Sequence, residues 1–187
     1  MHHRVANLLV LGLLAVACGS PAPTALPTDL PTTGPSAPPD FEIETAQFVT
    51  TGGCGDAFFW ATNAAGTAAI TVEWLGAASQ AWMNDSFEAS KQLPNSEITV
   101  SVVEGKQLSG YWCNDVRMPG QGPTSTIEAS TGTVDLSVTP NRQGFEPAGQ
   151  ADLRLSNVTF NVTLGSGQTW HLDELVIEDV SVGWFAG

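Results

Sequence analysis

Two short motifs place a carboxylate two residues after a cysteine: Cys54-Gly55-Asp56 and Cys113-Asn114-Asp115. If the fold brings the motifs together, their carboxylate and amide oxygens form the oxygen-rich surroundings that calcium prefers. Two aspartates fall short of the roughly six to eight oxygen ligands that calcium takes, and no calcium-loop spacing such as D-x-D-x-D-G occurs. We therefore expect Asp56 and Asp115 to accept hydrogen bonds from turn amides, with no cofactor, and keep calcium binding at these residues as the alternative.

Catalytic residues of the usual kinds are scarce. His171 is the only histidine outside the first three residues, and it stands between Trp170 and Leu172. No G-x-S-x-G, S-x-x-K or H-E-x-x-H motif accompanies it, so a base that would activate a nucleophile is missing. The sequence predicts a protein that is not an enzyme. The enzymatic alternative is a pair of carboxylates for glycoside hydrolysis, although no spacing singles out such a pair.

Six tryptophans accompany a single tyrosine. An indole ring offers a large flat apolar face, which suits stacking against a sugar ring or a protein surface. Trp82 and Trp170 are the first two to examine for exposure, and they are the candidate ligand-binding residues. The other four stand in apolar strand contexts, and we expect them to fill the core: Trp60, Trp74, Trp112 and Trp184.

The amino-terminal segment has the three-part layout of an export signal. Residues 1–4 carry a positive charge, residues 5–17 are almost wholly apolar, and small residues surround the end of the apolar run. The run is too short to cross a bilayer as a helix, which takes about 20 apolar residues. We therefore interpret residues 1–17 as a signal rather than a membrane span.

The end of this segment, Ala15-Val16-Ala17-Cys18, resembles the lipobox of bacterial lipoproteins, although that family prefers leucine at the position of Ala15. The resemblance implies that residues 1–17 are a lipoprotein signal peptide and that Cys18 carries the lipid. It also implies that the protein is anchored through this lipid to the outer face of a bacterial cell membrane. An ordinary secretory signal with an unrelated cysteine is the alternative.

With Cys18 assigned to lipid by this resemblance, Cys54 and Cys113 remain as an even pair in an exported chain. Exported chains meet an oxidising compartment, so we expect these two residues to form a disulfide. A metal site is less well supported, because neither cysteine belongs to a Cys-x-x-Cys spacing and one histidine is available outside the signal.

The chain is strongly acidic. Its formal net charge is -13, and removal of residues 1–17 takes away Arg4 and leaves -14. Such a charge excludes nucleic acid as a partner, because binding phosphates relies on clustered lysine and arginine. Residues 19–40 are rich in proline and contain no aromatic or basic residue, so we expect residues 18–40 to form a lipidated, disordered tether.

Residues 41–187 are predicted to form one domain, since their number suits a single core. Apolar and small polar residues alternate in stretches such as 98–102, 134–138 and 158–164, and residues 108–113 are among the further predicted strands. A period of two indicates half-buried strands. Their number and their short turns favour an all-β fold, an antiparallel β-sandwich.

Two departures from this alternation carry structural predictions. The pattern slips by one residue between Leu155 and Val158, and again between Ile177 and Val180, which predicts a bulge or a bend at each place. The stretch at about 77–93 does not alternate in the same way. We expect one short helical or irregular crossover there, with Met83 and Phe87 on the same face of a helix.

These observations favour a lipid-anchored extracytoplasmic binding or surface-interaction module. Rigid strands and aromatic anchors suffice for recognition, and the expected partners are the membrane, through the lipid, and an envelope glycan or a protein. The alternatives are a structural envelope lipoprotein without a small ligand and a carboxylate-based enzyme resembling glycoside hydrolases. The sequence does not specify the ligand or the oligomeric state.

Overall fold

The protein is described by a computed structural model over residues 48–143, 148–162 and 168–183. It is an all-β fold with one α-helix in the described part, as the sequence predicted. No helix in this part is long and apolar enough to cross a membrane. The elements are β1 (Phe48–Cys54), β2 (Phe58–Asn63), β3 (Ala68–Trp74), α1 (Ala77–Asn84), β4 (Phe87–Leu93), β5 (Ile98–Lys106), a 3-10 turn η1 (Leu108–Gly110), β6 (Gly122–Pro140), β7 (Ala148–Val162) and β8 (Gln168–Gly183).

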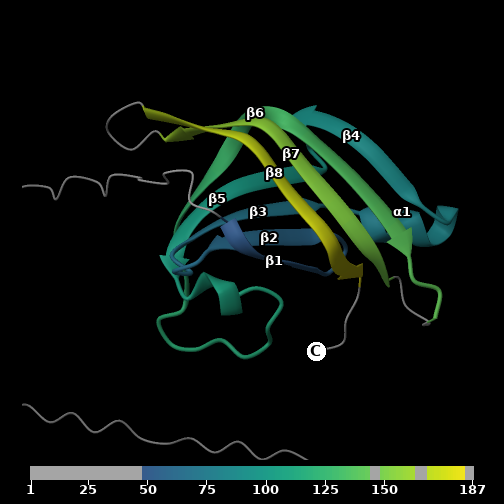
Figure 1. Cartoon of the computed structure of the whole chain (residues 1–187), viewed down its shortest axis with the longest axis horizontal. Helices are drawn as coiled ribbons and strands as arrows, with labels where there is room; N and C mark the ends of the chain where they lie inside the picture. Colours follow the sequence, from purple (N-terminus) through teal and green to yellow (C-terminus); the bar gives the residue numbers. More distant parts are fainter. Residues whose placement is uncertain (1–47, 144–147, 163–167, 184–187) are drawn as a thin grey trace, which may run out of the picture. The chain divides into compact units, whose positions relative to one another are not determined.

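All paired strands are antiparallel, and they form two sheets that share β6 (Figure 1). Sheet A contains β1, β2, β3, β5 and the first half of β6, in that order. Sheet B contains β4, the second half of β6, β7 and β8. An isolated bridge between Gly55 and Gly183 joins the end of β8 to the chain just after β1, so the sheets nearly close into a barrel.

The strand β6 passes from one sheet to the other at a bend. Its register with β7 shifts twice between Ala129 and Thr133. Gly132 lies within this bend at a φ of 140°, and a Cβ atom there would lie 2.9 Å from the Cα atom of Val158. A glycine is therefore needed at the point where the strand turns the corner.

The two slips in the sequence pattern are irregularities in the strands. Asn157 in β7 and Asp179 in β8 have positive φ angles of 52° and 55°, and the strand register shifts beside each. Asp152 supports the second irregularity, because its Oδ1 atom accepts a hydrogen bond of 2.9 Å from the backbone N–H of Asp179. Both predicted bulges are confirmed.

The main core lies between the two sheets and is built from inward-facing residues at alternate strand positions. Trp74 is its largest side chain, and the Trp74 ring meets Phe87 edge-on with centroids 5.6 Å apart. The helix α1 packs against this core through three buried alanines, Ala77, Ala78 and Ala81. The core thus accounts for one of the expected core tryptophans, Trp74.

The predicted crossover at residues 77–93 is helical in its first half alone. The second half is β4, which pairs with β6 along its whole length. Met83 and Phe87 therefore do not share a helical face: Met83 is 71% exposed, whereas Phe87 packs against the core. Alternate residues of β4 are turned toward the core, and this period of two favours a strand.

Candidate functional site

The loop between β5 and β6, residues 107–121, lies on the outer face of sheet A (Figure 1). It begins with η1, so the strand predicted over residues 108–113 is wrong. Leu108 is buried with Ala69 and Val103 in a small hydrophobic cluster that is separate from the main core. The loop is therefore packed against the sheet through its own apolar contacts.

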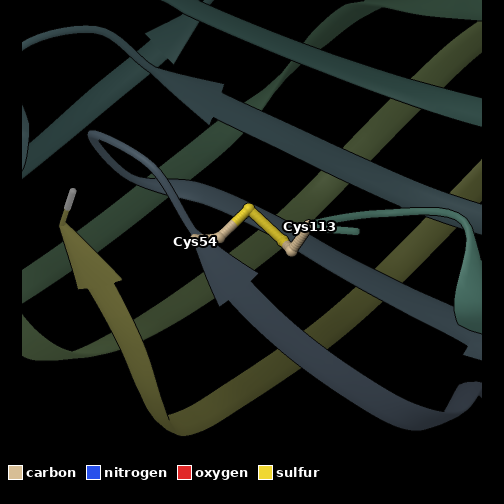
Figure 2. Close-up of a disulfide and its surroundings, with 2 residues drawn as sticks. All are labelled: Cys54 and Cys113. Atoms are coloured by element: carbon tan, nitrogen blue, oxygen red, sulfur yellow. A yellow bond between two sulfur atoms is a disulfide. The ribbon is translucent and has the colours of Figure 1, made fainter. Parts of the chain in front are cut away.

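A disulfide attaches this loop to the end of β1. Cys54 is the last residue of β1, and Cys113 belongs to the loop just after η1 (Figure 2). Their Cα atoms lie 5.9 Å apart, and the sulfur atoms are bonded. The predicted disulfide is confirmed, and it joins segments that are 59 residues apart in the sequence.

Three aromatic rings lie in contact with one another beside this disulfide. Trp112 lies between Phe58 of β2 and Tyr111 of the loop, with ring centroids 5.8 Å and 4.8 Å away. The Arg117 guanidinium sits over the Tyr111 ring, 5.0 Å from its centroid. The indole N–H of Trp112 is buried and has no hydrogen-bond partner in the described part of the chain.

These rings border a cavity of about 740 Å³, which we call the disulfide cavity. Its volume falls within the range of small-ligand sites, about 300–1,000 Å³. Polar groups share the lining with the rings, and three of them are carboxylates. The residues that matter for its chemistry are Asp56, Phe58, Glu73, Leu75, Tyr111, Trp112, Asn114, Asp115 and Arg117.

Asp56 connects the disulfide cavity to the helix α1. Its Oδ2 atom accepts a hydrogen bond of 2.7 Å from the backbone N–H of Gly76, and its Oδ1 atom accepts one of 3.0 Å from the backbone N–H of Ser79. The Ser79 hydroxyl donates a further hydrogen bond of 3.2 Å to Oδ1. The carboxylate thus satisfies N–H groups at the start of the helix, where negative charge is also stabilised by the helix dipole.

The structure brings Asp56 and Asp115 to the same cavity, as the paired motifs suggested. Both oxygens of Asp56 are engaged with the start of α1, which is the role expected of it. Asp115 accepts no hydrogen bond from another described residue, so the same expectation is wrong for Asp115. Among the described residues, no group of three or more His, Cys, Asp or Glu side chains is arranged to hold a metal ion. Calcium binding at these two aspartates stays a prediction.

The two tryptophans proposed as ligand anchors lie near opposite ends of the β7–β8 pair. Trp82 is half-buried in α1, where Arg142 donates a hydrogen bond of 2.8 Å to its carbonyl and covers its ring at 5.1 Å. Arg142 follows the end of β6, beside the first residues of β7. Trp170 is half-buried against the main core and pairs with Phe160 near the other end of β7, where the two ring centroids lie 4.9 Å apart. The two indoles therefore do not form one platform.

Two of the tryptophans expected in the main core lie elsewhere. Trp60 and Trp112 are half-buried, and Trp112 packs on the small cluster under the loop on the outer face of sheet A. Successive side chains of β2 point to opposite faces of the sheet. Phe59 is buried, so its neighbours Phe58 and Trp60 point to the outer face. Trp184 lies outside the described residues. The apolar strand context did not reveal that the outer face of this sheet is covered.

A second, more open hollow of about 730 Å³ lies on the outer face of sheet B. Arg154 pairs with Glu174 there, and it is the one basic residue lining a hollow that is otherwise rich in carboxylates. The acidic lining residues are Glu88, Asp135, Asp152, Glu174 and Glu178.

His171 lines neither hollow. Its Nδ1 atom lies 3.3 Å from the Thr159 hydroxyl and its Nε2 atom lies 3.3 Å from Asp173. The order hydroxyl, imidazole, carboxylate is that of a hydrolytic triad. All of these groups are on the exposed surface of the β7–β8 pair, and the Asp173 side chain is 94% exposed, so the surroundings that would exclude water from a reaction are missing here.

Comparisons of the chain with protein-family models, with curated proteins and with solved structures found no match. Sequence reasoning had not proposed Phe58, Tyr111, Trp112 or Arg117 as site residues. A usable signal was present, because Tyr111 and Trp112 directly precede a disulfide cysteine, and a run rich in proline and glycine follows a few residues later at 119–123. Such a run is typical of a loop, and loops on a rigid scaffold often carry binding residues.

One carboxyl group outside the disulfide cavity is electrostatically unusual. Glu104 is half-buried on β5, and this burial raises the pKa of its carboxyl above the ordinary value of 4.5. Burial removes water from the ionised form and thereby favours the protonated form.

The Cys54→Ala, Cys113→Ala double variant should be less stable than the native protein. Removing a bridge across a loop of about 60 residues should lower the free energy of unfolding by on the order of 4 kcal/mol in the chain-entropy account. Chemical denaturation monitored by tryptophan fluorescence measures this loss. An unchanged unfolding midpoint would show that the bond does not stabilise the fold.

Glu104→Gln should stabilise the protein at neutral pH and not in acid. A raised carboxyl pKa means that the folded state binds the proton more tightly than the unfolded state, so stability falls as the pH rises above the unfolded pKa. Glutamine does not ionise, so the variant does not lose stability in this way as the pH rises. Thermal unfolding at about pH 7 and about pH 3.5 measures the difference, because the glutamate is protonated in both states at the lower value.

Glu128→Gln is the matched control, because Glu128 is an exposed glutamate on β6 and its replacement changes the net charge equally. If Glu104→Gln gives no more stabilisation at neutral pH than this control, burial of Glu104 is not the cause.

Proposed function

We propose that this protein is a lipid-anchored extracytoplasmic binding module whose ligand occupies the disulfide cavity. The observation that carries the proposal is a cavity of about 740 Å³ bordered by the rings of Phe58, Tyr111 and Trp112. Aromatic rings with a few polar groups are the usual lining of ligand sites. Rigid aromatic side chains also provide contact area at low cost in conformational entropy.

Support for the proposal comes from the way in which the walls of the cavity are held. The disulfide fixes the loop, Asp56 fixes the start of α1, and the Tyr111 and Trp112 rings pack edge-on against each other. A site that is formed before the ligand arrives loses less conformational entropy on binding. This arrangement suits recognition, and it requires none of the proton-transfer groups that an enzyme would need.

The location outside the cell rests on the sequence. The lipobox resemblance at residues 15–18 supports a lipid on Cys18, and the Pro-rich composition of residues 19–40 suits a spacer. In an extended polyproline conformation this spacer would reach up to about 70 Å, at about 3.1 Å per residue. The binding domain would then stand well clear of the membrane surface, where it can meet an envelope glycan or a protein.

The Tyr111→Leu variant should lose affinity for the ligand. Leucine keeps apolar volume at this position but removes the flat ring, and we expect binding to weaken by on the order of tenfold. The measurement is a titration, followed by intrinsic fluorescence, of the full chain carrying Cys18→Ser with envelope polysaccharides and with envelope protein extracts fractionated to single components.

Trp82→Leu serves as the control, because Trp82 is half-buried beside an arginine in the same way but lies in α1. Unchanged affinity in Tyr111→Leu together with a loss in Trp82→Leu would place the ligand site on the helix. Thermal unfolding of both variants separates a loss of binding from a loss of fold.

Replacing Cys18 with serine should release the protein from membranes. Two or three acyl chains anchor a protein firmly, and serine cannot accept the thioether-linked lipid. Cell fractionation followed by detergent extraction measures the distribution. Retention of the serine variant in the membrane fraction at the native level would contradict the lipid anchor.

A further inference from the structure

We propose that the disulfide cavity binds a cationic side chain, an arginine or a lysine, presented by a protein partner. This inference rests on the proposed function, because it names the chemistry of the ligand for the same site. It follows from the charges of the lining residues, from the contact that the Tyr111 ring already makes, and from apolar side chains at the edge of the cavity.

The lining of the cavity carries an excess of negative charge. Three carboxylates, Asp56, Glu73 and Asp115, face a single basic residue, Arg117. Asp56 accepts hydrogen bonds from the start of α1. Glu73 and Asp115 make no hydrogen bond or ion pair with any other described residue, so these two carboxylates can pair with a ligand. An anionic ligand would be repelled, and a cationic one would be attracted.

The aromatic side of the cavity already accepts a cation. Arg117 comes from the same loop and lies 5.0 Å from the centroid of the Tyr111 ring. Guanidinium and ammonium groups are attracted to the negative face of an aromatic ring, most strongly where water is partly excluded. The chain thus contains its own example of the contact that we assign to the partner, and Arg117 competes with the partner for the Tyr111 ring.

Apolar side chains at this site favour a protein as the source of the cation. Leu75 lines the cavity and is 58% exposed. Val116 and Met118, on either side of Arg117 in the chain, are 69% and 61% exposed. Exposed apolar groups beside a polar cavity are typical of protein contact surfaces. A peptide with apolar residues next to its arginine would cover them, whereas a hydrophilic amino sugar would leave them in water.

The test uses two peptides that differ at the arginine position alone. The first peptide copies the order valine, arginine, methionine found at residues 116–118. The second has citrulline in place of the arginine. Citrulline keeps the planar shape of the side chain without its charge. By calorimetry with the full chain carrying Cys18→Ser, we expect the arginine peptide to bind about tenfold more tightly than the citrulline peptide.

Variants of the lining residues locate the effect. Glu73→Gln with Asp115→Asn should weaken binding of the arginine peptide severalfold at low salt and leave the citrulline peptide unaffected. Arg117→Ala should strengthen binding of the arginine peptide, because it removes both a competing cation and a repelling charge. Arg142→Ala is the matched control, since Arg142 covers Trp82 in the same way, lines no part of the disulfide cavity and should change nothing.

Several outcomes would overturn the inference. Equal binding of both peptides would keep the cavity as a binding site and reject the requirement for a cation. If a glucosamine tetramer binds more tightly than the arginine peptide, the requirement for a cation stands but its source is a sugar and not a protein. The N-acetylglucosamine tetramer is the neutral control for that measurement. Weaker binding after Arg117→Ala would contradict the competition. If none of these probes binds, the inference fails, while the proposed function is still decided separately by the Tyr111→Leu titrations.

Discussion

Three consecutive residues at the end of β1, Cys54, Gly55 and Asp56, join the loop, the second sheet and the helix to one point of the structure. Cys54 is covalently bonded to the loop at residues 107–121, and the carbonyl of Gly55 accepts the hydrogen bond from Gly183 that brings the two sheets together. Asp56 then binds the start of α1 through both of its oxygens. A loop, a second sheet and a helix are thus attached at one point, and the candidate site lies beside that point.

Most of the residues that form the site lie outside the main core. The main core lies between the sheets and is filled by side chains such as Trp74, Phe59 and Phe160. The disulfide cavity lies at the edge of that core. Most of its lining comes from the loop at residues 107–121 and from outward-facing residues of sheet A, whereas Ala57 and Trp74 line the cavity and also belong to the core. Changes in the loop can therefore alter what the cavity accepts without repacking the core, as is common where a rigid scaffold carries functional loops.

Much of the fold was predictable because it depends on local pattern. Alternation of apolar and polar residues predicted the strands, and its slips predicted the irregularities at Asn157 and Asp179. The disulfide followed from counting cysteines in a chain expected to be exported. The stretch from Met83 to Leu93 was harder, because a spacing of four in so short a segment suits one helical face, whereas pairing of β4 with β6 is a long-range contact that the sequence does not display.

The candidate site was predictable in part. The motifs around Cys54 and Cys113 correctly suggested that Asp56 and Asp115 would meet, because the bond between the cysteines fixes that neighbourhood. The sequence pattern predicts a strand through Tyr111 and Trp112, whereas their position in the structure depends on how the loop folds back over sheet A. Trp82 and Trp170 looked equivalent in sequence, yet their positions near opposite ends of the β7–β8 pair depend on the topology of the whole domain.

One disulfide holds the preformed cavity in place on a barrel-like fold whose strands pair without it. Amide hydrogen exchange in the oxidised and the reduced protein tests this role of the disulfide most directly. In the oxidised protein, the amide of Tyr111, which donates to the Leu108 carbonyl at 3.1 Å, should be protected together with the strands. Reduction should remove protection from residues 107–121 and leave β6, β7 and β8 protected. Equal loss of protection throughout the domain, or retained protection in the reduced loop, would contradict the account.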